Sequence, residues 1–364
     1  MRIALIAPPF LNIPPTKQGG IEAVLTAKIH ELVKMGHRIT LFHAGEANFQ
    51  GIEHVTVYPT AINDLKQDLA AEESSRKLRL EMTYFALAAT QIIKRQADFD
   101  VVFNHTRGEV AFAPLTEFLN VPIISTFHLP VLKENIEVLR ANPKAYAISI
   151  SNNQRGQWQD LPNFLATVYN GVELEKYPVL ANPAKDFVFW IGTIGEHKNT
   201  LDAILAAKKA GVKIILAGKI RDQKYHQEKI APLIDDKTVV YVGEITYEEK
   251  LPYFQNALAT LFPTKWPEPF GLVMIESLAC STPVIAYPSG AVPEVIVDGE
   301  VGFVVNSADA MAEAINKVKN LDRAKCRQYV EEKFSATVMT NNYLKAAEKV
   351  IAPKVKKGLL SWLK

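Results

Sequence analysis

The chain has 364 residues, of which 48% are apolar and 22% are charged, and its formal net charge is +2. A length above the usual range of one domain predicts two domains, and the composition is typical of an ordinary globular enzyme. So small a net charge gives no reason to expect a nucleic-acid partner.

The first half of the chain alternates short apolar runs with amphipathic stretches. Strands are predicted over 2–7, 37–44, 55–59, 99–105, 121–128 and 144–151. Helices are predicted over 21–35, with Gly36 ending the helix, and over 73–96. Strands rich in Val, Ile and Phe and separated by helices indicate a parallel sheet covered on both faces.

A linker with two prolines is predicted over 167–186, and the strand–helix pattern then restarts. Strands are predicted over 187–192, 212–218, 238–243, 257–263, 282–288 and 302–306. The sequence therefore predicts an α/β fold with two doubly wound domains, which cover 1–172 and 173–344. A C-terminal helix over about 345–364 is expected to join the first domain. Ligands of such sheets bind beyond the carboxyl ends of the strands, so we expect the domains to face each other across a cleft.

The two ends of the chain and its cysteines bear on its location. The apolar run at 3–7 is too short for a secretion signal, and no run approaches the roughly 18 residues of a membrane span. Cys280 and Cys326 form no CxxC motif, which favours the reducing cytoplasm. Residues 353–364 hold four lysines and no acid. Either their apolar side chains dock on the protein, or the segment lies peripherally on the anionic inner surface of a membrane.

Glu268 and Glu276 stand eight positions apart beside a helix predicted over 270–280. That spacing is roughly 12 Å along a helix axis, beyond the roughly 5–9.5 Å between the two carboxylates of a glycosidase. The two glutamates are therefore expected to hold separate hydroxyl groups of one extended ligand, a nucleotide sugar. Free backbone amides near Phe270, Gly271 and Leu272 would hold its diphosphate. The alternative is a helix-start charge at Glu268 and a solvated face residue at Glu276.

The run Glu268-Pro-Phe-Gly…Glu276-Ser-Leu-Ala-Cys, followed by Pro283-Val-Ile-Ala, resembles the signature of glycosyltransferase family 4. Gly19-Gly20-Ile21-Glu22, Thr126-Phe127-His128 and the segment 192–198 extend the resemblance. It implies the GT-B fold and a retaining hexosyl transfer without metal or cofactor, in which the leaving diphosphate takes the acceptor's proton. The donor implied is a nucleotide sugar, with UDP favoured, and the acceptor is a glycan, a lipid, a protein or a small molecule.

The resemblance also assigns roles in donor binding. Glu268 would hold hydroxyls of the donor sugar, Glu276 the ribose hydroxyls, and Lys198 the diphosphate. The family has an arginine where Thr193 stands, so Lys219 is a candidate second cation, with a solvated loop lysine as the alternative.

Further roles follow from the same resemblance. Gly243 and Ile245 would read the base, and the backbone at Gly19 and Gly20 would approach the diphosphate. His128 would orient the transferred sugar as a catalytic residue together with Glu268 and Lys198. On the acceptor side, candidate residues are His105 and Arg107, with Glu109 beside them.

Three other functions are alternatives to a transferase. A non-catalytic partner subunit of GT-B fold is favoured by Thr193 alone. A nucleotide-sugar epimerase of GT-B fold does not usually carry the Glu-Pro-Phe-Gly…Glu helix. A nicotinamide-dependent dehydrogenase needs a GxGxxG after its first strand, and 8–20 holds none.

Overall fold

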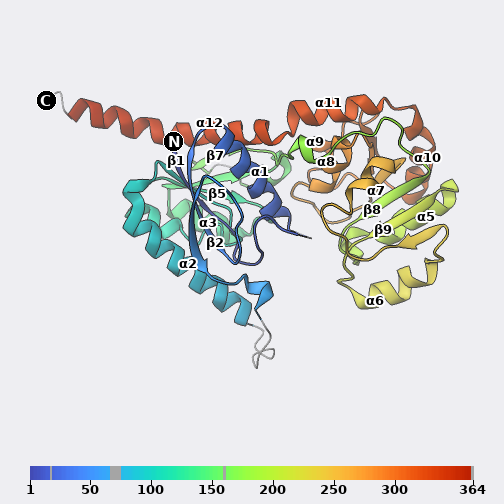
Figure 1. The fold of residues 1–364 in the computed structure, drawn as a ribbon, viewed down its shortest axis with the longest axis horizontal. Coiled ribbons are helices and arrows are strands. Elements are labelled where there is room, and N and C mark those ends of the chain that lie inside the picture. Colours follow the sequence, from blue (N-terminus) through green and yellow to red (C-terminus); the bar gives the residue numbers. More distant parts are fainter. Residues whose placement is uncertain (17–18, 66–74, 159–160, 362–364) are drawn as a thin grey trace. The chain divides into compact units, whose positions relative to one another are not determined.

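The computed structural model describes residues 1–16, 19–65, 75–158 and 161–361, with side chains up to residue 351. The chain divides into two compact units. The N-terminal unit comprises Met1–Tyr169 and Met339–Lys364, and the C-terminal unit comprises Asn170–Val338 (Figure 1). The sequence placed these divisions at 172/173 and at about residue 345.

The N-terminal unit is built on a seven-stranded sheet of order β3-β2-β1-β4-β5-β6-β7, with every pair of neighbours parallel. Its strands are β1 (Arg2–Ile6), β2 (Arg38–Ala44), β3 (Glu53–Tyr58), β4 (Val101–Asn104), β5 (Ile123–Phe127), β6 (Ala145–Ser149) and β7 (Phe164–Thr167). Six of them match the predicted strands. The seventh, β7, is a short edge strand whose four residues are all half-buried, so it lacks the apolar run that marks the others.

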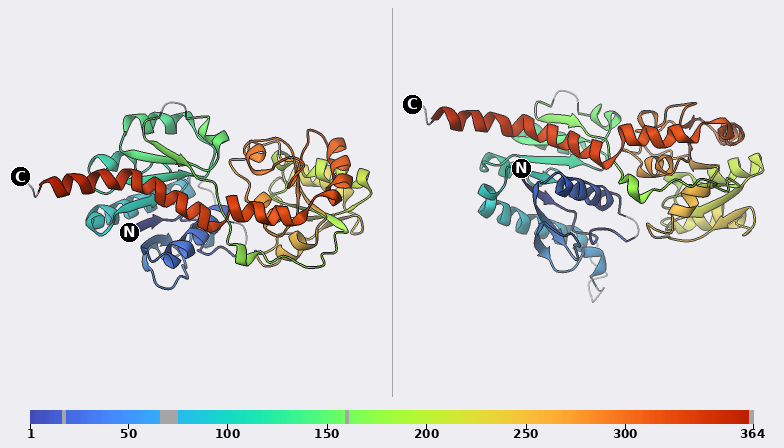
Figure 2. Two further views of the ribbon diagram at one scale, coloured as in Figure 1. Left: turned by 90° about the horizontal axis from the view of Figure 1, so that it is seen from above. Right: turned by 45° about the horizontal axis from the view of Figure 1, so that its top comes forward.

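The helices of this unit cover the sheet and leave its carboxyl edge to loops. They are α1 (Gly20–Lys34), α2 (Arg76–Arg95), α3 (Lys133–Ala141), α4 (Asn152–Arg155) and α12 (Ala336–Ser361). Gly36 follows α1 with a φ of 76°, the left-handed conformation predicted for the end of that helix. From Met339 onward α12 belongs to the N-terminal unit and runs along it as the long red helix of Figure 2.

The C-terminal unit is a second parallel sheet, of order β10-β9-β8-β11-β12-β13. Its strands are β8 (Phe187–Ile191), β9 (Lys213–Ala217), β10 (Val239–Tyr241), β11 (Ala259–Phe262), β12 (Val284–Ala286) and β13 (Gly302–Val304). All six lie within the predicted runs. The helices are α5 (Thr200–Ala210), α6 (Gln223–Tyr225), α7 (Leu251–Asn256), α8 (Leu272–Ala279), α9 (Val292–Val295), α10 (Ala308–Lys317) and α11 (Arg323–Lys333).

Apolar burial holds each sheet against its helices. In the C-terminal unit, Ile204 of α5 and Ile315 of α10 pack with Leu216 and Leu261 of the sheet, all fully or almost fully buried. Each such side chain contributes about 1.5–3 kcal/mol when removed from water. The predicted α/β class with two doubly wound units is confirmed.

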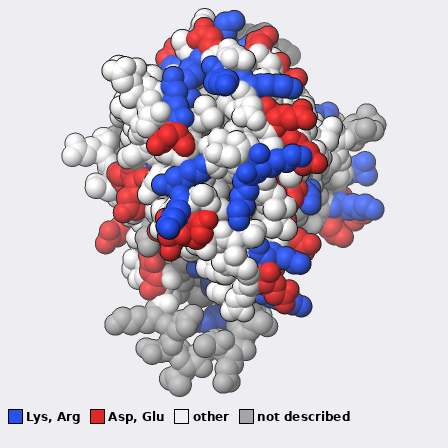
Figure 3. Space-filling model, turned by 90° about the vertical axis from the view of Figure 1, so that its right-hand side faces the viewer, with Lys and Arg blue, Asp and Glu red and all other residues white. Residues whose placement is uncertain are grey.

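Charges are interspersed on the face drawn in Figure 3, where Lys and Arg side chains alternate with Asp and Glu. Of the helices in the described part of the chain, none is long and apolar enough to cross a membrane. The two interpretations of residues 353–364 both depend on their side chains, which lie outside the described part of the structure.

Candidate functional site

A pocket of about 810 Å³ opens at the carboxyl ends of β8 and β9 in the C-terminal unit. Its lining residues follow these strands or β11: Thr193, Gly195, His197, Lys198, Arg221, Asp222, Gln223 and Trp266. In the sheet order, chain connections run from β8 to one side and from β11 to the other, so the switch point of the sheet lies between these neighbours. Ligands of doubly wound sheets bind at this point.

Lys198 and Glu268 form an ion pair within this region, between the loops that follow β8 and β11. Both side chains keep about a fifth of their surface exposed, so a ligand can reach them. The two loops are also joined through His197, whose carbonyl accepts from the amide of Lys265 at 3.1 Å and of Trp266 at 3.3 Å. Burial, aided by the charges of Lys198 and Arg221, lowers the pKa of His197.

Glycine holds the backbone of Glu268 in place. The carbonyl of Glu268 accepts from the amide of Ala291 at 2.9 Å. Gly290, at a φ of 58°, lies so close behind it that a Cβ would stand 2.2 Å from that carbonyl oxygen. A residue other than glycine would therefore displace the loop that carries Glu268.

Helix α8 begins directly after this loop, with Gly271 at its N-cap in a left-handed conformation. The backbone amides of Gly271, Leu272 and Val273 donate to no acceptor in the described residues. Unpaired first-turn amides of this kind are suited to an anion. The side chain of Phe270 is buried, so only its backbone is open to a ligand.

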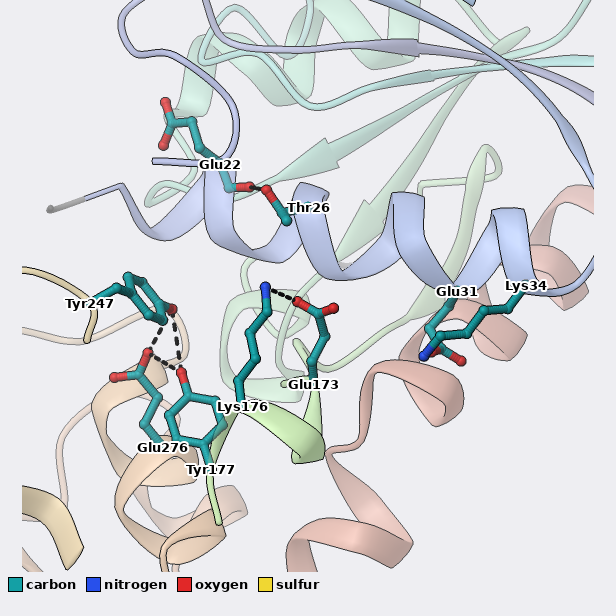
Figure 4. A network of polar contacts seen from close by, with 9 residues as sticks. All are labelled: Glu22, Thr26, Glu31, Lys34, Glu173, Lys176, Tyr177, Tyr247 and Glu276. Atoms are coloured by element: carbon teal, nitrogen blue, oxygen red, sulfur yellow. Dashed lines mark hydrogen bonds and ion pairs between the residues drawn. The ribbon is translucent and has the colours of Figure 1, made fainter. Parts of the chain in front are cut away.

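Glu276 lies in the fifth position of α8, about one turn inside the helix, because α8 begins at Leu272 and not at residue 270 as predicted. Its Oε1 accepts from Lys250 Nζ at 2.7 Å, Tyr247 Oη at 2.9 Å and Tyr177 Oη at 3.1 Å. Figure 4 shows both tyrosines directed at this oxygen. The residue is only 3% exposed, which rules out the alternative of a solvated face residue.

The two glutamates therefore have separate partners. Glu268 pairs with Lys198 and Glu276 with Lys250, and no hydrogen bond joins the two carboxylates within the described residues. Oε2 of Glu276 has no partner there either. Burial and the Glu276 charge raise the pKa of Tyr177 and Tyr247 well above the ordinary value.

Of the other donor-side residues, Thr193 lines the pocket but Lys219 does not. Lys219 is exposed, and the pocket receives Arg221 instead, two positions later. Gly243 follows β10 and its carbonyl accepts from the amide of Gly218 at 2.7 Å, while Ile245 is half-buried. Sequence reasoning missed Arg221, His197 and Trp266, and also Tyr177, Tyr247 and Lys250 around Glu276.

In the N-terminal unit, His105 and His128 follow the neighbouring strands β4 and β5. Nδ1 of His105 lies 2.9 Å from Nε2 of His128. His105 is fully buried, so its side chain presents no surface to an acceptor in this structure. His128 keeps 8% of its surface exposed. Burial, and to a lesser extent the nearby Lys28, lowers the pKa of His128 to about 3, so its imidazole is neutral.

Arg107 is exposed and lies over the ring of Phe10, 4.5 Å from its centroid. Nearby Glu109 is buried, which raises its pKa to about 8. Gly19 is the N-cap of α1 and Gly20 its first residue. A Cβ at Gly19 would stand 2.8 Å from that of Pro15, so this turn has room for glycine alone.

Comparison with known proteins matches both units to one family. Residues 18–176 match Glycosyltransferase Family 4, and residues 173–333 match Glycosyl transferases group 1. The chain belongs to the group 1, family 4-like glycosyltransferases. The predicted resemblance is confirmed over residues 18–333.

Curated relatives of this glycosyltransferase are distant. It is 23% identical over 340 residues to a phosphatidyl-myo-inositol mannosyltransferase of Mycolicibacterium smegmatis, which covers 86% of the chain and 84% of the relative. It is 29% identical over 203 residues to an uncharacterized protein in the cps region of Klebsiella pneumoniae, covering 50% of the chain. The match spans only about half of the Klebsiella protein, 54% of its length.

Solved structures share the fold. AviGT4, a glycosyltransferase involved in avilamycin A biosynthesis, has a TM-score of 0.75 at 22% identity, with 97% of the chain and 98% of AviGT4 covered. Anabaena HepE in complex with UDP and glucose has a TM-score of 0.68 at 18% identity, with 96% of the chain and all of HepE covered. The GT-B prediction is thereby confirmed. Within the described residues, no group of three or more His, Cys, Asp and Glu side chains is placed to hold a metal ion.

Proposed function

We propose that this glycosyltransferase moves a hexosyl unit from a nucleoside-diphosphate sugar to an acceptor hydroxyl with retention of configuration. The observation that carries the proposal is the pocket at the switch point, which is lined by two cations, Arg221 and Lys198, the second of them paired with the carboxylate of Glu268. A UDP-sugar is the favoured donor, since HepE, which shares the fold, was solved with UDP and with UDP-glucose.

In the proposed reaction, the bond between the sugar's C1 and the diphosphate oxygen breaks. A bond from C1 to the acceptor oxygen forms on the same face, and the leaving diphosphate takes the proton of the acceptor hydroxyl. Lys198 and Arg221 offset the negative charge that grows on the diphosphate, together with the free amides of Gly271 and Leu272. We propose that these groups suffice without a metal or a cofactor.

The two glutamates are proposed to hold opposite ends of the donor. Glu268 accepts hydrogen bonds from hydroxyl groups of the transferred sugar. Glu276 accepts a hydrogen bond from a ribose hydroxyl with its unpartnered Oε2. Tyr177, Tyr247 and Lys250 fix the other oxygen of Glu276, so the carboxylate is oriented before the donor arrives. Gly243 and Ile245 are assigned to the base.

The N-terminal unit is proposed to bind the acceptor, with Arg107 as its exposed cation and His128 orienting the transferred sugar. The backbone at Gly19 and Gly20 is assigned to the diphosphate. We place the protein in the cytoplasm, in peripheral contact with the membrane through 353–364. Pelleting with anionic vesicles, compared between the full chain and one that ends at residue 352, tests that contact.

The purified full chain, incubated with a panel of UDP-, GDP-, ADP- and dTDP-sugars, tests the donor. We expect slow release of nucleoside diphosphate from a UDP-hexose, a product with the donor's anomeric configuration by proton NMR, and equal rates with and without EDTA. An inverted product would contradict retention, and loss of activity in EDTA would contradict independence of metal.

One observation favours a second function. Thr193 stands in the pocket where the family's arginine is expected, as in a partner subunit that kept the fold without the activity. Binding of nucleotide sugars without release of diphosphate from any of them would support this alternative. Donor hydrolysis that disappears in Lys198→Met would exclude it.

A further inference from the structure

Lys28 is a lysine on the buried face of α1, with none of its surface exposed. Its Nζ lies 3.5 Å from the ring centroid of Phe103 and 3.6 Å from that of Tyr343. Within the described residues no carboxylate comes within ion-pair distance of it, and burial alone shifts its pKa. The apolar neighbours Val24 and Leu32, one turn before and after it, show that a core residue is expected at this position.

This lysine ends a chain of three side chains joined by hydrogen bonds. Lys28 Nζ lies 3.0 Å from Nε2 of His105, and Nδ1 of His105 lies 2.9 Å from Nε2 of His128. The remaining nitrogen, Nδ1 of His128, has no partner in the described part of the chain. His128 as a whole keeps 8% of its surface exposed, whereas Lys28 and His105 keep none. The chain therefore runs from the core of the unit to its surface.

The proton positions follow from the charge of Lys28. Burying an ammonium group without a carboxylate costs free energy, and the faces of two aromatic rings stabilise the charge by only about 2 kcal/mol each. Burial accordingly lowers the pKa of Lys28 well below its ordinary value, and those of both histidines are lowered as well. Complete burial of Lys28 and His105, with no carboxylate beside Lys28, therefore favours the neutral form of both groups.

A neutral amine has one lone pair and two N–H groups. Its basicity exceeds that of imidazole by about four pKa units, so in this pair the amine is the acceptor and the imidazole N–H is the donor. The two N–H groups of Lys28 then lie against the faces of Phe103 and Tyr343. Each neutral imidazole has one donor and one acceptor nitrogen. The direction of the hydrogen bond between Lys28 and His105 therefore decides the direction of the hydrogen bond between His105 and His128.

We propose that Lys28 and His105 are positioning residues that hold His128 in the tautomer with its proton on Nε2, leaving Nδ1 as an acceptor for a hydroxyl of the transferred sugar. His105 donates from Nε2 to Lys28 and accepts at Nδ1 from His128. The role of Nδ1 of His128 as an acceptor for a sugar hydroxyl rests on the function proposed above. The assignment of the tautomer does not depend on that function.

Nitrogen NMR of the full chain, labelled with ¹⁵N at histidine, tests the tautomer without any substrate. The signals of His128 are assigned with His128→Gln. In the wild type we expect a protonated Nε2 and an unprotonated Nδ1 for both His105 and His128. A proton on Nδ1 of His128 in the wild type would overturn the proposal, and this measurement needs no variant that must fold.

Lys28→Met then removes the terminal acceptor and keeps the length and apolar contacts of the side chain. We expect His128 to become a mixture of both tautomers and kcat to fall roughly tenfold, with the donor KM little changed. Lys34→Met, an exposed position of the same helix, serves as the control and should match the wild type in both. An unchanged tautomer in Lys28→Met would overturn the positioning role, whatever the stability of the variant.

The two proposals fail differently. If the protein transfers no sugar yet His128 shows the expected tautomer that Lys28→Met disturbs, the proposed function is wrong and the positioning chain stands. If transfer is normal and the tautomer is the other one, the positioning chain alone is wrong.

Discussion

Lys198 and Glu268 neutralise each other across the switch point of the C-terminal sheet, and each is the other's ionic partner within the described residues. A diphosphate would draw the ammonium of Lys198 away from Glu268, and the carboxylate would then be free to accept from a sugar hydroxyl. Because the pair is held by loops tied together through His197, neither side chain has to be ordered when the donor binds.

Replacing Glu268 with alanine should separate turnover from nucleotide binding. We expect kcat to fall by at least roughly 100-fold, because the transferred sugar loses the carboxylate that orients its hydroxyl groups. The Kd for UDP should stay near that of the wild type, since UDP lacks the hexosyl group that Glu268 is proposed to hold. Turnover is followed by release of UDP and binding by calorimetry. Glu196→Ala, at an exposed position of the same region, is the control, and equal losses in turnover and UDP binding would contradict the assignment.

Arg221, rather than Lys219, is expected to supply the second cation for the diphosphate. Arg221→Met should weaken UDP binding roughly tenfold, a loss of about 1.4 kcal/mol, because the pocket loses one of its positive charges. Binding of uridine, which has no phosphate, should not change. Lys219→Met is the matched control outside the pocket. A larger loss of UDP affinity in Lys219→Met than in Arg221→Met would return the role to Lys219.

Lys250 is expected to stabilise the fold through Glu276. Lys250→Met leaves a carboxylate that is 3% exposed without its cation, and the free energy of unfolding should fall by about 3–5 kcal/mol. Tyr247→Phe removes one neutral donor and should cost only about 1 kcal/mol. Urea denaturation measures both. The double variant Lys250→Met/Glu276→Gln should recover part of the loss, and no recovery would mean that Lys250 acts through other contacts.

Glu109 should make stability depend on pH. Burial raises its pKa from 4.5 to about 8, with the charge of Glu81 adding to the effect. Between these values the folded state holds a proton that the unfolded state releases, so the free energy of unfolding falls as pH rises through this window.

Glu109→Gln removes that contribution. The stability of the variant relative to the wild type should therefore increase from about pH 5 to about pH 8, by roughly 1–3 kcal/mol in total. Urea denaturation across this range measures the difference, with the exposed Glu134→Gln as control. A difference that does not change with pH would mean that Glu109 is ionised in the fold.

Local patterns in the sequence determined most of the architecture. Buried parallel strands are continuous apolar runs, and runs such as 187–192 and 212–218 stand out without any tertiary information. The short edge strand β7 could not be found this way, because its residues are half-buried and carry no periodicity. The spacing of Glu268 and Glu276 predicted that the two carboxylates do not act as one pair, and in the structure each pairs with a different lysine.

Tertiary structure alone decided which side chains meet. Thr193 looked like a missing cation along the chain, yet the parallel pairing of β8 and β9 brings Arg221 into the same pocket. His105 looked like a surface residue, yet Lys28 and Tyr343, from helices far apart in sequence, enclose it. Sequence periodicity reports the neighbours of a residue on its own helix or strand. The partners that complete a site come from loops placed side by side by strand order, which no local pattern encodes.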